Sequence, residues 1–561
     1  MPPKLTAAEI EARDAARLNE LGYKQELKRE LTSLGNYGVA LSVVCISSGL
    51  TSLYEYGLTT GGPVVMVWGW VIVAFFTMAV ALAMAEISSA YPTSGGLYWW
   101  AARLSTKKYA PFASWMTGWF NLIGQFAVTA GINYGIASML AAVISVGTNG
   151  TWVPTAGATV GLHIAMCFTQ GIANSLGPKV TSAINAFSTW WQVIAPAVIM
   201  ITMAVKAPTH QPASFVFTKF NNNTGWSSTA YVAVIGILQA QFTLTGYDSS
   251  AHMSEETKNA EVSGPVGMVM AVLVSSIMGF CFIIAFLFCI QDLNATINSD
   301  TGFPVMQIMF DSVGNAGAIC LMVMLIIACW QCGFASVTAN SRMIYAFSRD
   351  GAIPGHKYWH KIDVKRQTPL NAVWLSVIVA SLLGLPSLGN STAFSAITSV
   401  ATIGLYISYA VPIFAKLLNR GHFVRGPLHL GRFSDIIGII SIFWISLITI
   451  LFVLPPKYPV DAVNMNYACL AVGMVLLGAG GRFAIDARKW FTGPKINLPQ
   501  DKLDKVNLEQ DRKGIRGLSS NDIETGDSKE DSRMSSEKSG IEKEQKKEDN
   551  DIRVAEIEKI E

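Results

Sequence analysis

Charged residues are scarce in this sequence. Only 14% of the 561 residues are Asp, Glu, Lys or Arg, whereas 51% are hydrophobic and the mean hydropathy is +0.38. A soluble globular domain carries about 25% charged residues, so the composition excludes an ordinary soluble protein. We therefore expect a chain embedded in a lipid bilayer, and no nucleic-acid partner.

Several chemical motifs are also missing. The sequence has no Walker A loop, so ATP does not drive the protein directly, and no catalytic set that would indicate an enzyme. His163, His356 and His360 lack neighbours with metal-ligand spacing, and we expect no cofactor or bound metal. Residues 1–30 are too polar and charged to be a cleavable signal peptide.

Cysteine is present but offers no disulfide framework. Each of the eight cysteines lies in an apolar stretch, where Cys behaves as a small hydrophobic residue: Cys45, Cys167, Cys281, Cys289, Cys320, Cys329, Cys332 and Cys469. The Cys329-Trp330-Gln331-Cys332 segment has the spacing of a redox pair but no thioredoxin-like context. We expect neither a redox nor a metal-binding role for it.

Long hydrophobic stretches are what the sequence has in abundance. Most of them reach the roughly 20 residues that a helix needs to cross about 30 Å of hydrocarbon. They lie near 37–57, 63–85, 113–146, 157–173, 182–205, 229–252, 265–290, 314–338, 370–389, 394–416, 435–454 and 464–481. The sequence therefore predicts an all-α polytopic membrane protein with about twelve transmembrane helices.

The charges between these stretches predict an orientation. With the N-terminus in the cytosol, the cytosolic loops hold fifteen basic residues and the external loops hold three, Lys206, Lys219 and Lys457. This asymmetry follows the positive-inside rule and places both termini in the cytosol. The four Asn-x-Ser/Thr sequons, which are possible glycosylation sites, all fall in predicted external loops: Asn149, Asn222, Asn294 and Asn390.

Composition divides the chain into three parts. Residues 1–30 form a partly helical cytosolic segment, 31–490 the membrane domain, and 491–561 a charged tail. The tail has too few apolar residues to fold, so we expect a disordered cytosolic segment. It is either a solvated extension or, because of its Lys and Ser clusters, a contact for ubiquitin or trafficking machinery.

Two apolar helices are interrupted at corresponding places. The first stretch runs into Ser47-Ser48-Gly49, and the sixth, about Thr229 to Met253, contains Thr245-Gly246-Tyr247-Asp248. A helix break within lipid survives only where it lines a cavity, and paired breaks are typical of the substrate sites of secondary transporters. Because the breaks are five spans apart, a five-helix repeat would insert its second copy in the opposite orientation.

Each break has a functional interpretation and a structural one. If the first helix unwinds at Ser47, Ser48 and Gly49, the half-helix that follows offers free amides to a carboxylate. Alternatively, these small residues only allow close helix packing.

Asp248 is about two helical turns from the charged end of the sixth span. It either caps the half-helix that follows or contacts substrate, and one role does not exclude the other. Gly246 supplies the break, and the ring of Tyr247 could close over a substrate. His252 is either a proton relay or a satisfied polar residue near the helix end. Other residues could line the cavity or simply pack: Trp330, Asn133, Tyr134, Ser399 and Thr402.

Three further segments resemble a known family. The run from Ala85 to Trp100, AEISSAYPTSGGLYWW, closely resembles the cytosolic-loop motif of the amino acid–polyamine–organocation (APC) superfamily. The run from Gly246 to Lys258 and the run SRMIYAFSRDGAIP from Ser341 to Pro354 agree with it. With GYKQELKR at 22–29, they look most like the eukaryotic γ-aminobutyrate, choline and general amino-acid permease branch.

This resemblance implies a five-plus-five inverted-repeat core with spans 11 and 12 at the periphery. It also implies that the unwound parts of spans 1 and 6 grip the carboxylate and amine of an amino acid. The family's usual Gly-Ser-Gly in span 1 stands here as Ser47-Ser48-Gly49. Some proton-coupled bacterial relatives carry a Lys in span 5, and that place falls on Gln192.

We therefore expect a secondary transporter that moves an amino acid or a related amine such as γ-aminobutyrate by alternating access. Its substrate site would comprise Ser47, Ser48, Gly49, Gly246, Tyr247, Asp248 and Trp330, with a proton or sodium ion as a possible coupling ion. Choline or polyamine transport, a non-transporting nutrient sensor and a channel are the alternatives. The plasma membrane and the vacuolar or another internal membrane are both open.

Overall fold

The computed structural model describes residues 7–25, 27–299, 301–363, 365–389, 392–462 and 464–495. Within these ranges, eleven helices are long and apolar enough to cross a membrane, and Thr229–Thr243 is a shorter apolar helix. Together they correspond to the twelve predicted stretches, which confirms the all-α polytopic fold.

The membrane elements follow one another along the chain, some as single helices and some in pieces. They are α2 (Ser33–Val43) with α3 (Ile46–Ser52); α5 (Gly62–Ala90); α7 (Ala110–Gly147); α8 (Ala156–Asn174); α9 (Pro178–Lys206); α11 (Thr229–Gly236) with α12 (Leu238–Thr243) and α13 (Ser249–His252); α14 (Ala260–Phe288); α16 (Pro304–Arg349); α18 (Leu370–Leu383) with η2 (Leu385–Leu388); α19 (Ala393–Leu418); α20 (Ser434–Leu451); and α21 (Ala468–Val475) with η5 (Leu476–Gly480) and α22 (Gly481–Ile485).

Short elements connect the spans. They are α1 (Ala7–Glu20), α4 (Tyr54–Thr59), α6 (Leu97–Leu104), α10 (Ala213–Thr218), η1 (Ser254–Glu256), α15 (Leu293–Ile297), α17 (His356–Trp359), η3 (Arg420–His422), η4 (Gly431–Phe433) and η6 (Ala487–Lys489). The two-residue strands β1 (Thr60–Gly61) and β2 (Asn221–Asn222) pair antiparallel, Thr60 with Asn222 and Gly61 with Asn221.

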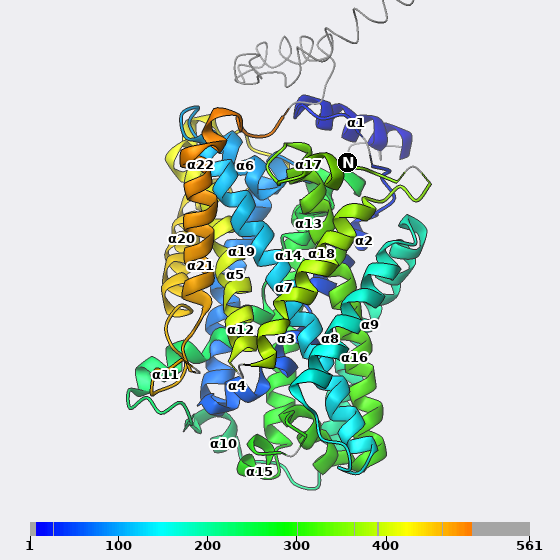
Figure 1. The fold of residues 1–561 in the computed structure, drawn as a ribbon, viewed down its shortest axis with the longest axis vertical. Helices are drawn as coiled ribbons and strands as arrows, with labels where there is room; N and C mark the ends of the chain where they lie inside the picture. The colour runs from blue at the N-terminus through cyan, green and yellow to red at the C-terminus, as the bar shows by residue number, and fades with distance from the viewer. Residues whose placement is uncertain are drawn as a thin grey trace, which may run out of the picture.

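Both ends of the described chain lie at the same end of the bundle, which Figure 1 shows at the top with α1, α6, α17 and α22. The elements α4, α10, α11 and α15 lie at the opposite end. The first span, α2 to α3, runs away from the terminal end, and the sixth, α11 to α13, runs toward it (Figure 1). The two interrupted spans are therefore antiparallel, as the inverted repeat requires.

Burial separates a core from a periphery. In the first span 83% of the most apolar 18-residue window is buried, and in α7 the share is 72%. For the spans built on α20 and α21 the shares are 33% and 11%. Spans 11 and 12 are therefore peripheral, as the resemblance implies.

The longest helix departs from the prediction. The stretch expected at 314–338 belongs to α16, whose 46 residues are too long for a single membrane crossing. Gly314, with φ of 75°, kinks the chain near its start. The extension beyond 338 is buried against other parts of the protein: Arg342 pairs with Glu256, and the Phe347 ring lies 5.0 Å from that of Tyr98.

The segment before residue 31 docks on the bundle. Arg17 of α1 donates to the Ala90 carbonyl (2.8 Å), and its Nε lies 2.8 Å from a Glu261 carboxylate oxygen. Contacts also continue past residue 490. The Phe491 ring lies 5.0 Å from that of Trp115, and the Lys495 amide donates to Asp350 (3.0 Å). The rest of the expected tail, 496–561, lies outside the described residues.

Candidate substrate site

The break in the first span lies at Val44 and Cys45, not at the predicted Ser47-Ser48-Gly49. Val44 has ψ of 41° and Cys45 has ψ of 108°, so α2 ends and α3 begins there. The helical hydrogen bonds lost at this point are replaced by side-chain donors. The Cys332 thiol donates to the Val43 carbonyl (3.5 Å), and the Ser275 hydroxyl donates to the Val44 carbonyl (3.2 Å).

Ser47, Ser48 and Gly49 form the first turn of α3. The amides of Ser48 and Gly49 donate to the Cys45 carbonyl at 3.1 and 3.2 Å. Ser47 is fully buried, and its hydroxyl has no hydrogen-bond partner within the described part of the chain. Gly49 packs closely, because a Cβ there would lie 2.6 Å from the Cα of Thr243. Close packing thus accounts for Gly49, whereas Ser47 remains available to a ligand.

The break in the sixth span lies where the sequence predicts it. The chain leaves the helix after Thr243 and resumes it at Ser249, with φ of +98° at Gly246. A Cβ at Gly246 would lie 2.6 Å from Cγ1 of Val43, so the two breaks are in direct contact. Among the described residues, none of the amides of Thr245, Gly246 and Tyr247 donates to a backbone carbonyl.

The Asp248 carboxylate is buried and faces two other spans. Its Oδ2 accepts hydrogen bonds from Asn121 and Gln125 of α7, both at 3.0 Å, and its Oδ1 accepts one from Tyr409 of α19 (2.8 Å). It makes no side-chain cap bond to α13, so the capping alternative is not observed. A carboxylate away from water needs such donors, and here they join spans 3, 6 and 10.

His252 links this carboxylate to Ser94, in the segment from Ala85 to Trp100. Its Nε2 lies 3.3 Å from Oδ2 of Asp248, and its Nδ1 lies 3.1 Å from the carbonyl oxygen of Ser94. Both side chains are fully buried. The imidazole therefore connects the second break to the segment that carries the family resemblance.

Gln192 lies at the first break. Its Oε1 accepts a hydrogen bond from the Cys45 thiol (3.1 Å), and its Nε2 donates one to the Ala328 carbonyl (2.8 Å). The residue at the place of the relatives' lysine is thus a neutral bridge between spans 1, 5 and 8.

The sequence interpretation missed Asn121, Gln125 and Tyr409. A signal was present, because Asn121 and Gln125 are spaced i, i+4 in an otherwise apolar stretch and so share one helix face.

Comparison with known proteins identifies the family. A family model described as "Amino acid permease" matches residues 34–477. "Amino-acid permease BAT1 homolog" of Oryza sativa is 43% identical over 499 residues, which cover 86% of this chain and 96% of that protein. "Amino-acid permease BAT1" of Arabidopsis thaliana is 41% identical, with the same shares. "GABA-specific permease" of Saccharomyces cerevisiae is 30% identical, covering 89% of this chain and 90% of that protein.

The chain belongs to the amino acid permease family. Membership confirms the resemblance to the APC superfamily and makes this an integral, multi-pass membrane protein of amino-acid transport. The relatives are named as permeases, that is, as transporters and not as enzymes.

Of the two aromatic residues of the predicted site, one lies at a helix break and the other does not. Tyr247 lies at the second break, fully buried, with its ring 5.3 Å from that of Tyr409. Trp330 instead donates to Thr169 of α8 (2.9 Å) and stacks on Phe334. The structure joins the two breaks through Gly49 against Thr243 and Gly246 against Val43, but it directs Trp330 toward span 4.

The other lining candidates take part in contacts between spans. Asn133 donates to Gln170 of α8 (2.9 Å), and Tyr134 stacks on Phe394. Ser399 of α19 keeps a buried hydroxyl without a partner among the described residues, whereas Thr402 bonds back to the Thr398 carbonyl.

Ion pairs join α16 to the segment that follows α13 at the terminal end of the bundle. Arg349 pairs with Glu255 (3.4 Å) and Arg342 with Glu256 (2.7 Å), both directly after α13. The Arg349 guanidinium also lies 4.3 Å from the centre of the Tyr23 ring.

Beside these ion pairs, the Asp350 carboxylate accepts hydrogen bonds from the Tyr98 hydroxyl (2.7 Å) and the Lys495 amide (3.0 Å). Burial raises the pKa of Asp350 to about 6, although Arg349 and the two hydrogen bonds act against it. Burial also raises the pKa of Tyr98 and of Tyr23 well above the ordinary value.

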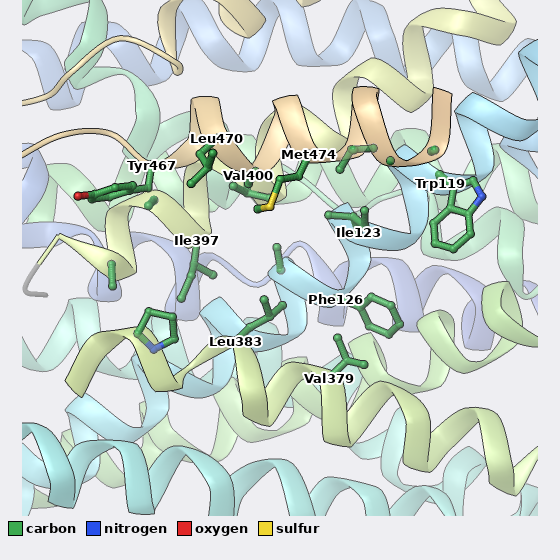
Figure 2. A pocket seen from close by; sticks show the side chains of 18 of the residues that line it. Trp119, Ile123, Phe126, Val379, Leu383, Ile397, Val400, Tyr467, Leu470 and Met474 are labelled. Carbon is green, nitrogen blue, oxygen red and sulfur yellow. The ribbon is translucent and has the colours of Figure 1, made fainter. Parts of the chain in front are cut away.

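A large apolar cavity lies elsewhere, between α21 and the core. It measures about 770 Å³, and Figure 2 shows Leu470 and Met474 of α21 pointing into it, with Phe126 and Leu383 on the other side. Its lining is almost wholly apolar, so it suits hydrocarbon and cannot satisfy the two charges of an amino acid. The cavity is therefore not the substrate site.

Three of the four sequons lie toward the end opposite the termini. Asn149 follows α7, Asn222 is in β2 and Asn294 is in α15, all exposed (Figure 1). The side-chain amide of Asn222 donates to the Trp226 carbonyl (2.7 Å). Asn390 lies outside the described residues, and glycosylation of all four stays a prediction.

Proposed function

We propose that this permease carries a zwitterionic amino acid across its membrane by alternating access, with the substrate held between the two helix breaks. Two observations support this proposal most strongly. The two breaks are in contact inside the buried core, and the Ser47 hydroxyl has no hydrogen-bond partner among the described residues. A buried polar group without a partner is costly, and a bound carboxylate would satisfy it.

In this proposal the substrate carboxylate binds Ser47 and the start of α3, beside Ser48. The ammonium group binds carbonyl oxygens of the unwound chain around Gly246, and Tyr247 covers the site. The positive end of α3 and the unwound carbonyls give each end of the zwitterion a partner of opposite polarity. The γ-aminobutyrate named for the yeast relative has the same two charged groups.

The charges near the breaks favour a zwitterion over a polyamine. A substrate with several positive charges and no negative one would require acidic partners, and the only buried acid at the breaks among the described residues is Asp248. Its carboxylate is already bound by Asn121, Gln125 and Tyr409. The buried acids nearer the terminal end are paired as well, Glu86 with Lys416 and Glu255 with Arg349.

Alternating access would work through α13. This short helix is tied to α2, because Asn36 donates to the Ser250 carbonyl (3.1 Å), and it ends at the acids paired with Arg349 and Arg342. Breaking these pairs would open the terminal end, which the basic loops assign to the cytosol. The ubiquitin or trafficking contacts proposed for the tail would regulate abundance rather than transport.

The test is uptake by purified full-length protein in liposomes. We expect saturable uptake of one or more amino acids, with choline and spermidine neither transported nor competing. Binding without flux would indicate a sensor, and non-saturable flux would indicate a channel. Transport of choline or spermidine in preference to amino acids would overturn the proposed substrate class.

A further inference from the structure

The geometry points to a proton-binding pair formed by Asp248 and His252, which couples proton movement to the transport proposed above. Both residues belong to span 6, one helical turn apart, and both side chains are fully buried. This inference rests on the proposed function and adds the coupling ion and the residues that would carry it.

The contacts of His252 leave one ring nitrogen open to a proton. Its Nδ1 lies 3.1 Å from the Ser94 carbonyl oxygen, which can only accept, so Nδ1 must carry a hydrogen. In a neutral ring, Nε2 would then present a lone pair to Oδ2 of Asp248 at 3.3 Å. Nε2 makes no hydrogen bond among the described residues, and a proton bound there would turn this contact between two acceptors into an attractive one.

The surrounding donors decide which atom holds this proton. Oδ2 of Asp248 already accepts from Asn121 and Gln125, and Oδ1 accepts from Tyr409. Three donors stabilise the charged carboxylate, so a proton taken up by the pair would bind Nε2 of His252. The pair is then an imidazolium beside a carboxylate, with no net charge.

No other charged side chain faces the pair in the described structure. Span 3 presents the two amides, and span 10 presents the neutral phenol of Tyr409. Beyond Ser94, whose amide donates to Glu255 (3.3 Å), the charge of Glu255 is balanced by Arg349. Loss of the proton would therefore leave one uncompensated negative charge in the core, which is strongly unfavourable.

This cost would link protonation to conformation. In the closed state, Ser94 and Asp248 hold the imidazolium from both sides. When α13 moves to open the terminal end, water reaches the pair, Nε2 releases its proton, and the carboxylate becomes solvated. One proton is bound at one side and released at the other, so no further reactant is needed.

The test compares gradient-driven accumulation with gradient-free exchange in liposomes that contain the full-length protein. The probe is a 14C-labelled mixture of the standard amino acids and γ-aminobutyrate. We expect the wild type to accumulate label at least tenfold when the outside is acidic, and a trapped pH dye to report substrate-dependent acidification. We expect His252→Gln to lose accumulation and acidification, to retain measurable exchange, and to exchange at a rate independent of pH.

The matched control is His163→Gln. His163 is also a fully buried histidine bonded to a carbonyl, that of Ala380 (3.1 Å), but no carboxylate is in contact with it in the described structure. The His163→Gln variant should accumulate label as the wild type does. Equal accumulation by His252→Gln, loss of its exchange as well, or wild-type transport that ignores the pH gradient would each overturn the coupling role. Absence of any wild-type flux would instead overturn the proposed function.

Discussion

At the break in span 1, the freed carbonyls of Val43 and Val44 accept hydrogen bonds from Cys332 and Ser275, while the hydroxyl of Ser47 stays without a partner. At the break in span 6, the charged residue is saturated by neighbouring spans, and it is the backbone amides around Gly246 that lack backbone partners. The first break thus offers a ligand a side-chain hydroxyl, and the second offers it backbone amides.

The difference shows that a charged residue beside a helix break need not contact substrate. Asp248 is directed away toward α7 and α19, so its charge serves the connection between spans. Ser47 is neutral, and its hydroxyl has no hydrogen-bond partner among the described residues. The substitutions below separate these two kinds of contribution.

The largest effect is expected for Gly246→Leu. Leucine disfavours φ of +98°, and its Cβ would lie 2.6 Å from Val43, so the two breaks could not remain in contact. Uptake should be abolished while the protein still reaches the membrane, as measured by surface labelling. Gly473→Leu is the control, because nothing lies within 4 Å of a Cβ at that position. Near-normal uptake by Gly246→Leu would contradict this placement of the site.

Gly49→Ala should have the next largest effect. Its new Cβ would lie 2.6 Å from the Cα of Thr243, so α3 and α12 must move apart. We expect uptake to fall by up to about a hundredfold, because an overpacked contact costs about 1–3 kcal/mol. Gly161→Ala in α8 has open space around it and should transport normally. If both variants transport alike, close packing of the breaks is not required.

Ser47→Ala should weaken substrate binding without disturbing the fold. A hydrogen bond to a charged group contributes about 1.5–3 kcal/mol, so we expect the KM to rise about tenfold or more. Ser114→Ala removes another buried hydroxyl that has no partner among the described residues and should leave the KM unchanged. An unchanged KM for Ser47→Ala would place the carboxylate elsewhere.

Much of the architecture could be predicted from the sequence because the bilayer imposes a simple rule on composition. Apolar stretches of about 20 residues must become helices, and the antiparallel placement of spans 1 and 6 follows from counting them. The break at Gly246 was predictable because glycine there is followed by a charged residue deep in an apolar helix.

Side-chain partners were not predictable in the same way. The break in span 1 moved to Val44 and Cys45 because Ser275 and Cys332, which are more than 200 residues away in sequence, supply the compensating donors. Likewise, nothing local to Trp330 indicates that its indole turns toward Thr169. Such choices depend on long-range packing, which a single sequence does not specify.

The smallest effect on transport is expected for Asp350→Asn. This variant tests the contact between the segment after the second break and the end of the described chain. Glu255, after α13, pairs with Arg349, and the neighbouring Asp350 binds Lys495 near the end of the described chain. Burial raises the pKa of Asp350 from 3.8 to about 6, so between those values the folded state holds more protons than the unfolded state. Stability should therefore fall as the pH rises through this interval, by up to about 3 kcal/mol.

Asp350→Asn removes this titration, so its melting temperature should decline less than that of the wild type between pH 5 and pH 7. Asp435→Asn, at a partly exposed acid paired with Arg420 (3.1 Å), should behave as the wild type does. Transport by Asp350→Asn should change less than transport by any variant at the breaks, because Arg349 keeps its pairing with Glu255. Equal pH dependence in the wild type and Asp350→Asn would show that Asp350 is ionised without penalty, and that the terminal contact is not pH-sensitive.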